Sequence, residues 1–336
     1  MGEFHYGSMA SNALISHLTT YLKGIAMGAA DVVPGVSGGT IAFITGIYEE
    51  LIGTIHKLDL GLFKLWKQDG FKAMWRHYNL GFLAVLFMGI ATSIFSLAKL
   101  ITHLLESHPV LVWAFFFGLI VASIIYVGKQ IERWNLGVLI ALVVGTAVSY
   151  SITIAEPIGS QDSLWFMALA GFIAIIAMIL PGLSGAFILL LLGAYEPVIG
   201  AISGLIDGLS GESDLMWESV LKLSVFAVGA IAGLKAFSGV LNWMFNNYKA
   251  ITLAVLTGFM LGALNKVWPW KEVLSTRINS KGIEVPLLEE SIAPANFNGD
   301  PQLVGAISCA VAGCVLILGF EWLAKRKSTL ADGRQA

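Results

Sequence analysis

The stretch DVVPGVSGGTIAFITGIYEELIGTI (residues 31–55) recurs in this chain as MILPGLSGAFILLLLGAYEPVIGAI (residues 178–202). At a constant offset of 147 positions (178 − 31), the two copies share 11 of 25 residues. The identities are Pro34/Pro181, Gly35/Gly182, Ser37/Ser184, Gly38/Gly185, Ile41/Ile188, Gly46/Gly193, Tyr48/Tyr195, Glu49/Glu196, Ile52/Ile199, Gly53/Gly200 and Ile55/Ile202. A helix-breaking motif that interrupts apolar sequence in both halves of a chain is the best sequence indicator of the binding site of a transporter built from repeats.

The composition places the chain in a membrane. Hydrophobic residues make up 57% of the 336 residues and charged residues only 12%, against about 25% charged residues in soluble domains. The net charge of −2 and the absence of a Lys/Arg-rich stripe give no indication of nucleic-acid binding. Long apolar segments recur at about 13–30, 40–56, 79–105, 110–128, 136–155, 164–180, 186–206, 219–245, 250–268 and 302–323. The sequence therefore predicts an all-α polytopic membrane protein.

We expect one integral membrane domain made of two repeats. The first repeat covers residues 13–155 and the second covers residues 156–325, and each consists of a broken helical hairpin followed by three transmembrane helices. Residues 1–12, which include the linker-like Gly7-Ser8, are interpreted as a tag or N-terminal tail, and residues 326–336 as a cytoplasmic tail. The polar stretch at about 269–301 is expected to be a loop between helices.

The loop charges predict the topology. The loops 57–78 and 129–135 and the C-terminal tail are rich in Lys and Arg, whereas 106–109, 156–163 and 207–218 contain neither. By the positive-inside rule the first group and both termini are cytoplasmic and the second group lies outside. Three crossings separate the two hairpins, so the second repeat is inverted relative to the first. The number of crossings alone does not decide whether each hairpin is re-entrant or spans the membrane. The prolines, which stop helices, favour re-entrant or broken helices.

A weaker repetition extends the alignment beyond the break. At an offset of 140 positions (229 − 89), Gly89 meets Gly229, Ala114 meets Ala254 and Gly118 meets Gly258. The helices after each broken hairpin therefore also correspond to one another.

Each break is predicted to bind an anion. A helix that starts after the break exposes unpaired N–H groups and the positive end of its dipole, and glycines let a ligand come close to that backbone. The alternative is that each motif is only a capped turn, with Ser37 and Ser184 as N-caps. Duplication in inverted halves favours the binding site. The predicted substrate-binding residues are Gly35, Ser37, Gly38, Gly39, Thr40, Gly182, Ser184, Gly185, Lys235 and Lys99.

The two lysines of this set lie within apolar segments. Ionisable groups at such depth usually face a cavity or a partner. Lys235 is interpreted as a cavity residue, with a structural ion pair as the alternative, and Lys99 as either a site residue or a snorkelling one. Asp31, Glu49 and Glu196 are candidates for coupling transport to H⁺ or Na⁺. For Glu49 and Glu196 the alternative is a structural salt bridge or a helix-end role. The histidines show no metal-ligand spacing, so no metal site and no other cofactor is predicted.

On these motifs the chain resembles the polyprenyl-phosphate transporter family PopT, long catalogued as an integral-membrane domain of unknown function. The resemblance rests on Gly28 to Thr40 (GAADVVPGVSGGT), Gly46 to Glu49 (GIYE), Leu180 to Gly185 (LPGLSG) and Gly193 to Glu196 (GAYE). It covers about residues 20–325. It implies a protein of the bacterial inner membrane that returns undecaprenyl phosphate to the cytoplasmic leaflet after the export of cell-wall polymers, with that lipid and the membrane as its partners.

Two other function classes stay open at the level of the sequence. Undecaprenyl-pyrophosphate phosphatases of the BacA type also use inverted hairpins, but their break carries an arginine, and no arginine lies in any apolar segment here. The lack of a guanidinium group that could stabilise the charge of the transition state disfavours pyrophosphatase activity. A small-anion carrier or channel shares the same helix-end chemistry.

Overall fold

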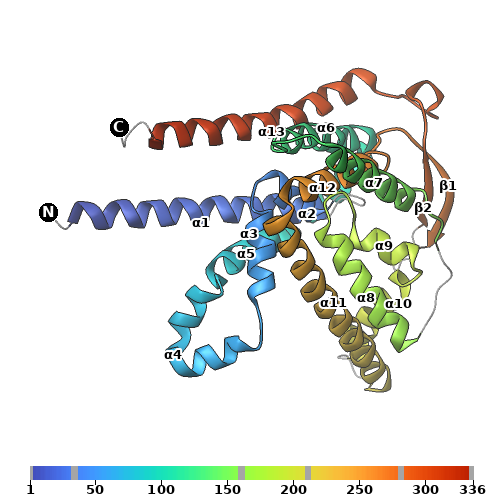
Figure 1. Cartoon of the computed structure of the whole chain (residues 1–336). Helices are drawn as coiled ribbons and strands as arrows, with labels where there is room; N and C mark the ends of the chain where they lie inside the picture. The colour runs from blue at the N-terminus through green and yellow to red at the C-terminus, as the bar shows by residue number, and fades with distance from the viewer. Residues whose placement is uncertain (1–2, 32–36, 158–162, 209–212, 279–283, 333–336) are drawn as a thin grey trace.

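The computed structural model describes residues 3–31, 37–157, 163–208, 213–278 and 284–332, and most of them are helical (Figure 1). The helices before the second copy are α1 (Glu3–Asp31), α2 (Gly38–Ile44), α3 (Tyr48–Lys57), α4 (Gly61–His77), α5 (Leu80–Ser107), α6 (Pro109–Gly128) and α7 (Leu136–Thr153). The later elements are α8 (Leu164–Ile179), α9 (Gly185–Leu191), α10 (Tyr195–Gly208), α11 (Ser213–Asn247), α12 (Lys249–Ala263), strands β1 (Lys271–Ile278) and β2 (Glu284–Ser291), a short 3₁₀ helix η1 (Pro294–Asn296) and α13 (Leu303–Asp332).

Four of the described helices are long and apolar enough to cross a membrane. They span Leu80–Leu97, Pro109–Gly128, Leu136–Thr153 and Met216–Asn247. A fifth candidate is the pair α9 and α10, which bends by 110° at its break. The prediction of a polytopic α-helical membrane protein is therefore confirmed.

The second segment of each predicted hairpin, 40–56 or 186–206, turns out to be two helices, whereas the first segment of each lies in a single helix, α1 or α8. The turn between α2 and α3 places Gly46 at φ +75°, and the turn between α9 and α10 places Gly193, its counterpart in the repeat, at φ +68°. Glycine adopts this left-handed conformation without steric cost, which is why both copies can turn at the same position.

Two predicted loops contain regular structure. Residues 57–78 hold α4, which has a kink at Gly70 (φ +82°). The polar stretch 269–301 holds β1 and β2, which pair antiparallel with Lys271 opposite Ser291. The expectation of an all-α chain with an irregular loop here is therefore wrong for this segment, because 271–278 and 284–291 pair with each other as strands.

Eight of the described helices pack in four close pairs: α1 with α5, α8 with α11, α6 with α13 and α7 with α12. Glycines allow the helices of the first two pairs to approach each other closely. A Cβ atom on Gly24 would meet the Leu86 carbonyl of α5, and one on Gly171 would meet the Phe226 carbonyl of α11. Small residues at such crossings let helix backbones approach closely inside a membrane.

The short helix α2 lies at the centre of the molecule (Figure 1). All seven of its residues, Gly38–Ile44, are buried, and it packs against α1, α3, α6 and α8. The apolar core around it includes Phe43, Tyr48, Leu86 and Ile120. The tertiary structure thus places the first break motif in the interior.

Candidate functional site

The N-terminus of α2, which follows the first break, is capped by nearby side chains. The carboxylate Oδ1 of Asp31, the last residue of α1, accepts a hydrogen bond from the Gly38 N–H at 2.6 Å. Ser37 is the N-cap of α2, and its Oγ accepts from the Gly39 N–H at 3.1 Å. The Thr40 N–H donates to the Ser37 carbonyl at 2.9 Å. The first N–H groups of α2 are therefore bonded within the chain, and one of them holds a carboxylate, as expected at a helix N-terminus.

The second break is more open. Ser184 is the N-cap of α9, but its side chain makes no capping hydrogen bond. Ser184 and Gly185 are partly exposed and Ala186 is exposed. Met178 occupies the position that Asp31 has in the first copy, since 31 + 147 = 178, and it is 45% exposed. The second helix start therefore has no carboxylate at this position.

The two breaks contact each other directly. The Ser37 hydroxyl donates to the Met178 carbonyl at 2.9 Å, and the Thr40 hydroxyl accepts from the Gly182 N–H at 2.8 Å. A Cβ atom on Gly39 would lie 2.6 Å from the Ile179 carbonyl oxygen. The structure thus brings together four of the predicted site residues (Ser37, Gly39, Thr40 and Gly182) from opposite halves of the chain. Gly35, another predicted site residue, lies outside the described residues.

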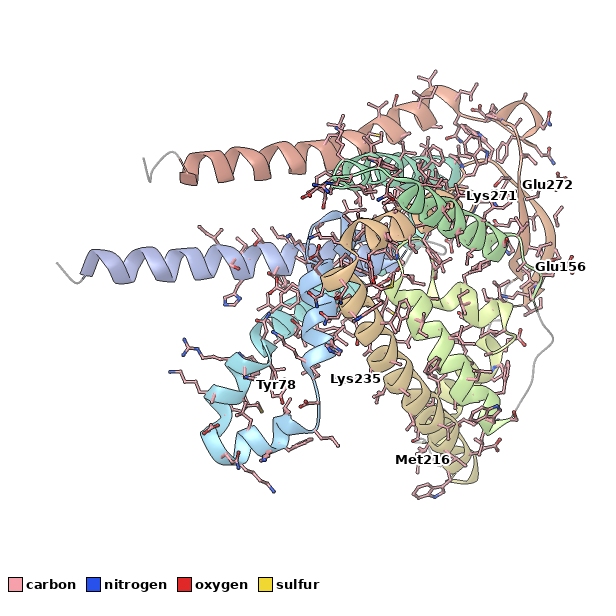
Figure 2. All side chains as sticks on the ribbon, in the orientation of Figure 1. Tyr78, Glu156, Met216, Lys235, Lys271 and Glu272 are labelled. Atoms are coloured by element: carbon pink, nitrogen blue, oxygen red, sulfur yellow. The ribbon has the colours of Figure 1, made fainter. Side chains whose placement is uncertain are left out.

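Lys235 lies elsewhere in this structure. Its ammonium group donates to the carbonyls of His56 and Leu58 at the C-terminal end of α3, where a cation is favoured by the helix dipole. Figure 2 shows it away from the strand that carries Lys271. None of its hydrogen bonds with described residues reaches a break, so its predicted role at the head group stays a prediction. Lys99 belongs to α5, and its side chain is outside the described part of the structure.

The two glutamates of the motif tails differ in their surroundings. Glu49, in the first turn of α3, forms an ion pair with Lys249 of α12 at 2.7 Å, and both side chains are about half exposed. Glu196 is exposed in the first turn of α10. An exposed ion pair such as Glu49–Lys249 contributes roughly 0–1 kcal/mol, and the coupling role of both glutamates stays a prediction.

The family of this chain follows from comparison with known proteins. Residues 27–285 match a family described as undecaprenyl phosphate translocase-like. A polyprenyl-phosphate transporter of Vibrio cholerae is 46% identical over 316 residues, which cover 93% of this chain and 98% of the relative. The chain belongs to this family. A polyprenyl-phosphate transporter of Staphylococcus aureus is 32% identical over 261 residues, covering 74% of this chain and 85% of the relative. No solved structure matches the chain.

The family and its relatives distinguish a transporter from an enzyme, two of the function classes that the sequence left open. Both relatives are transporters of polyprenyl phosphate, and the chain is accordingly a transporter rather than an enzyme. The resemblance noted on the break motifs is thereby confirmed.

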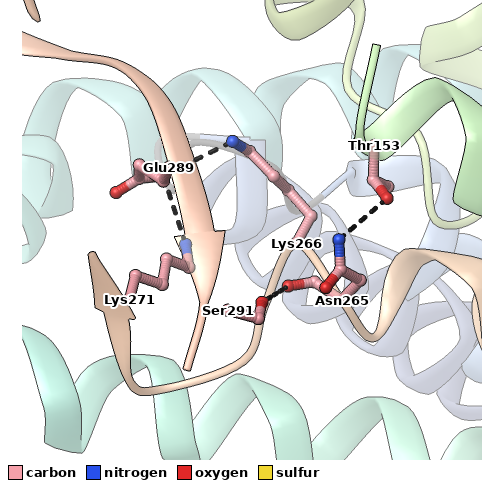
Figure 3. Close-up of polar contacts among 6 residues, drawn as sticks. All are labelled: Thr153, Asn265, Lys266, Lys271, Glu289 and Ser291. Atoms are coloured by element: carbon pink, nitrogen blue, oxygen red, sulfur yellow. Dashed lines mark hydrogen bonds and ion pairs between the residues drawn. The ribbon is translucent and has the colours of Figure 1, made fainter. Parts of the chain in front are cut away.

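The transporter carries a charged cluster that the sequence analysis missed. Lys266, in the turn after α12, and Lys271 of β1 both donate to Oε2 of Glu289 on β2, at 3.4 and 3.5 Å (Figure 3). Burial lowers the pKa of Lys271 to about 8, although the charge of Glu289 opposes that shift. Burial raises the pKa of Glu289, but the two ammonium groups outweigh it and hold that pKa below its usual value. The only indication of this cluster in the sequence was that Lys266 and Lys271 flank the segment that contains Trp268 and Trp270.

Metal ligands do not gather in the part of the transporter that the structure describes. There, no three His, Cys, Asp or Glu side chains come together in a way that could hold an ion.

Proposed function

We propose that this transporter moves undecaprenyl phosphate from the outer to the cytoplasmic leaflet of the bacterial inner membrane, so that the lipid is recycled for the synthesis of cell-envelope polymers. The phosphate head group crosses at the two breaks while the polyprenyl tail stays in the lipid. A charged phosphate cannot cross hydrocarbon unaided, whereas an apolar tail needs no carrier.

The observation that carries this proposal is the direct contact between the two breaks. The Thr40 hydroxyl and the Gly182 N–H join α2 to the segment before α9, so two helix starts from opposite halves share one location. Helix N-termini are the groups by which broken helices of transporters hold anionic substrates. Of the two starts, that of α9 is the accessible one, since Ala186 is exposed and Ser37 is 1% exposed.

Inverted repeats are part of the proposal, and the helix pairs support them. The pair α1–α5 of the first repeat corresponds to α8–α11 of the second, and Gly24 and Gly171, 147 positions apart, sit at the two crossings. The pairs α6–α13 and α7–α12 correspond in the same way once the repeats are exchanged. α1 begins and α13 ends on one side of the molecule, opposite the β1–β2 hairpin (Figure 1). We place the termini in the cytoplasm and the hairpin outside.

Asp31 gives the proposed cycle a coupling group. Its carboxylate occupies the α2 helix start in this structure, so a phosphate that uses the same N–H groups must displace it. Protonation of Asp31 weakens its hold on the Gly38 N–H and favours the exchange. Lys235 and Lys99 are proposed to add long-range positive charge, and Glu49 and Glu196 remain secondary candidates for coupling.

The proposal is tested in liposomes. Purified protein is reconstituted with undecaprenyl phosphate, and an impermeant phosphatase is added outside. Without transport the lipid of the inner leaflet stays protected; with transport it becomes accessible and is hydrolysed. Liposomes without protein are the control. Protection that is unchanged by the protein contradicts the proposal, and release of phosphate from undecaprenyl pyrophosphate without added phosphatase would favour an enzyme instead.

The orientation has its own test. Cysteines replace Asp69 and Glu156 one at a time in a variant without Cys309 and Cys314. An impermeant maleimide applied to intact cells should label Glu156→Cys and leave Asp69→Cys unlabelled. The reverse pattern contradicts the assigned topology.

A further inference from the structure

A cavity of about 260 Å³ lies beneath the β1–β2 hairpin. Its wall combines the end of α7, the helix α9, the turn after α12 and both strands. The cavity therefore borders the second broken hairpin directly, through Phe187, Leu190 and Leu191 of α9. On the topology proposed above, this is the outer side of the membrane.

Positive charge exceeds negative charge in the buried cluster beside this cavity. Lys266 and Lys271 share a single carboxylate oxygen of Glu289. The side chains of Lys271, Lys266 and Glu289 are 8%, 15% and 20% exposed. The two N···O distances of 3.4 and 3.5 Å are long for hydrogen bonds. Two ammonium groups with three donors each are thus weakly satisfied by one carboxylate, and a buried surplus of charge is costly unless an anion compensates it.

Aromatic rings fix the two ammonium groups in place. The Nζ atom of Lys271 lies 3.7 Å from the centroid of the Trp113 ring, and that of Lys266 lies 4.6 Å from the centroid of Phe187. Cation–π contacts of this kind leave the N–H groups on the far side of the ammonium free to bind an anion. Lys266 also lines the cavity itself, so its charge is available there.

The rest of the wall divides into a polar and an apolar part. Asn265 and Thr153 are joined by a hydrogen bond of 3.1 Å, and the Ser291 hydroxyl donates to the Asn265 carbonyl at 2.9 Å (Figure 3). Leu190, Leu191 and Leu287 supply apolar surface. A ligand that suits this wall has a compact anionic head and an apolar continuation.

The lining contains a second carboxylate, Glu290, which does not cancel this charge surplus. Glu290 lines the cavity together with Glu289, but unlike Glu289 it is exposed. Solvent screens an exposed carboxylate far more than a buried one. The cavity of about 260 Å³ has room for a phosphate group and one isoprene unit.

We propose that this cavity is an entry site for the lipid substrate, in which Lys266 binds the phosphomonoester head group, Lys271 adds charge behind it, and Leu190 and Leu287 contact the first isoprene unit. The inference rests on the proposed function and deepens it, because it places a first binding station on the outer flank of α9, before the breaks. Glu289 competes with the phosphate for the two ammonium groups and holds them apart when the site is empty.

Binding to the purified protein in detergent tests the entry site. The probes are farnesyl phosphate, farnesol and inorganic phosphate, and the measurement is isothermal titration calorimetry. Lys266→Gln should weaken the binding of farnesyl phosphate by about tenfold or more, because a hydrogen bond between charged groups is lost. Lys266→Arg should retain binding. Lys129→Gln, which removes an exposed lysine at the end of α6, is the matched control and should leave binding unchanged.

Glu289→Gln distinguishes a binding site from a structural ion pair. If Glu289 competes with the substrate, its removal tightens the binding of farnesyl phosphate severalfold. If the cluster only anchors the hairpin, the same change lowers the melting temperature and tightens nothing, which contradicts the inference. This variant keeps the test valid even where Lys266→Gln fails to fold.

The probes separate the sources of the anion. Binding of farnesyl phosphate together with weak binding of farnesol and inorganic phosphate supports a lipid-phosphate site. Equal binding of inorganic phosphate indicates a small-anion site and contradicts the lipid assignment. Normal binding by Lys266→Gln, with transport of undecaprenyl phosphate intact, removes the entry site but leaves the proposed function standing. An inactive wild-type protein in liposomes removes the proposed function instead.

Discussion

The two copies of the break motif share their sequence pattern but not their environment. In the first copy Ser37 and Thr40 are 1% and 0% exposed, and Asp31 caps the helix start. In the second copy Ser184 is partly exposed and caps nothing, and Met178 stands where Asp31 would be. The first N–H groups of α2 are thus bonded within the chain, whereas the N-terminus of α9 is partly exposed and has no side-chain cap.

Duplication of the motif has therefore not produced two equivalent sites. A Cβ atom on Gly38 would lie 2.6 Å from the Asp31 carboxylate, whereas one on Gly185 would lie 3.3 Å from the Cβ atom of Met178. The same position of the repeat thus carries an internal anion in one half and a neutral side chain in the other. We infer that the N-terminus of α9 binds the substrate and that the N-terminus of α2 responds to this binding.

The largest effect is expected from a valine in the first copy. Gly39→Val places a side chain against the carbonyls of Ile179 and Met178, at 2.6 and 2.8 Å from its Cβ atom. Such overpacking should destabilise the protein by about 1–3 kcal/mol or more and abolish transport. Unfolding in detergent, followed by circular dichroism, measures the first effect.

The matched control is valine at the equivalent position of the second copy, Ala186, which is exposed. Ala186→Val should change the free energy of unfolding by no more than about 0.5 kcal/mol. Equal destabilisation by both substitutions would show that the breaks are alike after all.

A carboxylate in the second copy should remove the difference between the two starts. Met178→Asp gives the α9 start the internal anion that α2 already has, so it should reduce transport by about tenfold or more, since a like charge opposes binding of the phosphate. Met178 is 45% exposed, so the shorter aspartate causes no overpacking. A carboxylate at membrane depth is costly, so the free energy of unfolding is measured beside transport. Met178→Leu keeps the volume without the charge and should transport normally; a loss with leucine as well would assign the effect to packing.

The serines should differ in their contributions to stability. Ser37→Ala removes an N-cap and the hydrogen bond to the Met178 carbonyl, and should cost about 1–2 kcal/mol. Ser184→Ala removes no capping bond and should stay within about 0.5 kcal/mol. Chemical denaturation of the two variants side by side measures this. A larger loss at Ser184 would contradict the description of the second start as open.

The last prediction concerns Lys235, which lies outside both breaks. Lys235→Gln removes a cation from the C-terminal end of α3 and should lower the stability by less than about 1 kcal/mol. If Lys235 also supplies charge to the transport path, transport falls severalfold while the thermal melt is nearly unchanged. Normal transport in this variant would limit Lys235 to its helix-capping role.

Much of the architecture was predictable because it depends on local sequence. Apolar length predicted α5, α6, α7 and α11, and the Pro-Gly motifs predicted that a helix ends before each break, as α1 and α8 do. The turns at Gly46 and Gly193 were not predicted. The amphipathic α4 and the β1–β2 hairpin were missed. Neither is apolar throughout, and a strand pair is stabilised only by contacts that its two strands make with each other and with the helices beneath.

The sequence by itself determined the membrane class, the repeat and the residues at each break, because hydrophobicity and helix-breaking residues act over a few neighbouring positions. The tertiary structure alone decided that Asp31 caps the first start, that Ser37 reaches the Met178 carbonyl 141 positions away, and that Lys266 and Lys271 share Glu289. Hydrogen bonds and ion pairs form over about 3 Å, so whether distant residues meet depends on how the helices pack. Similar motifs can therefore acquire different chemistry from different neighbours.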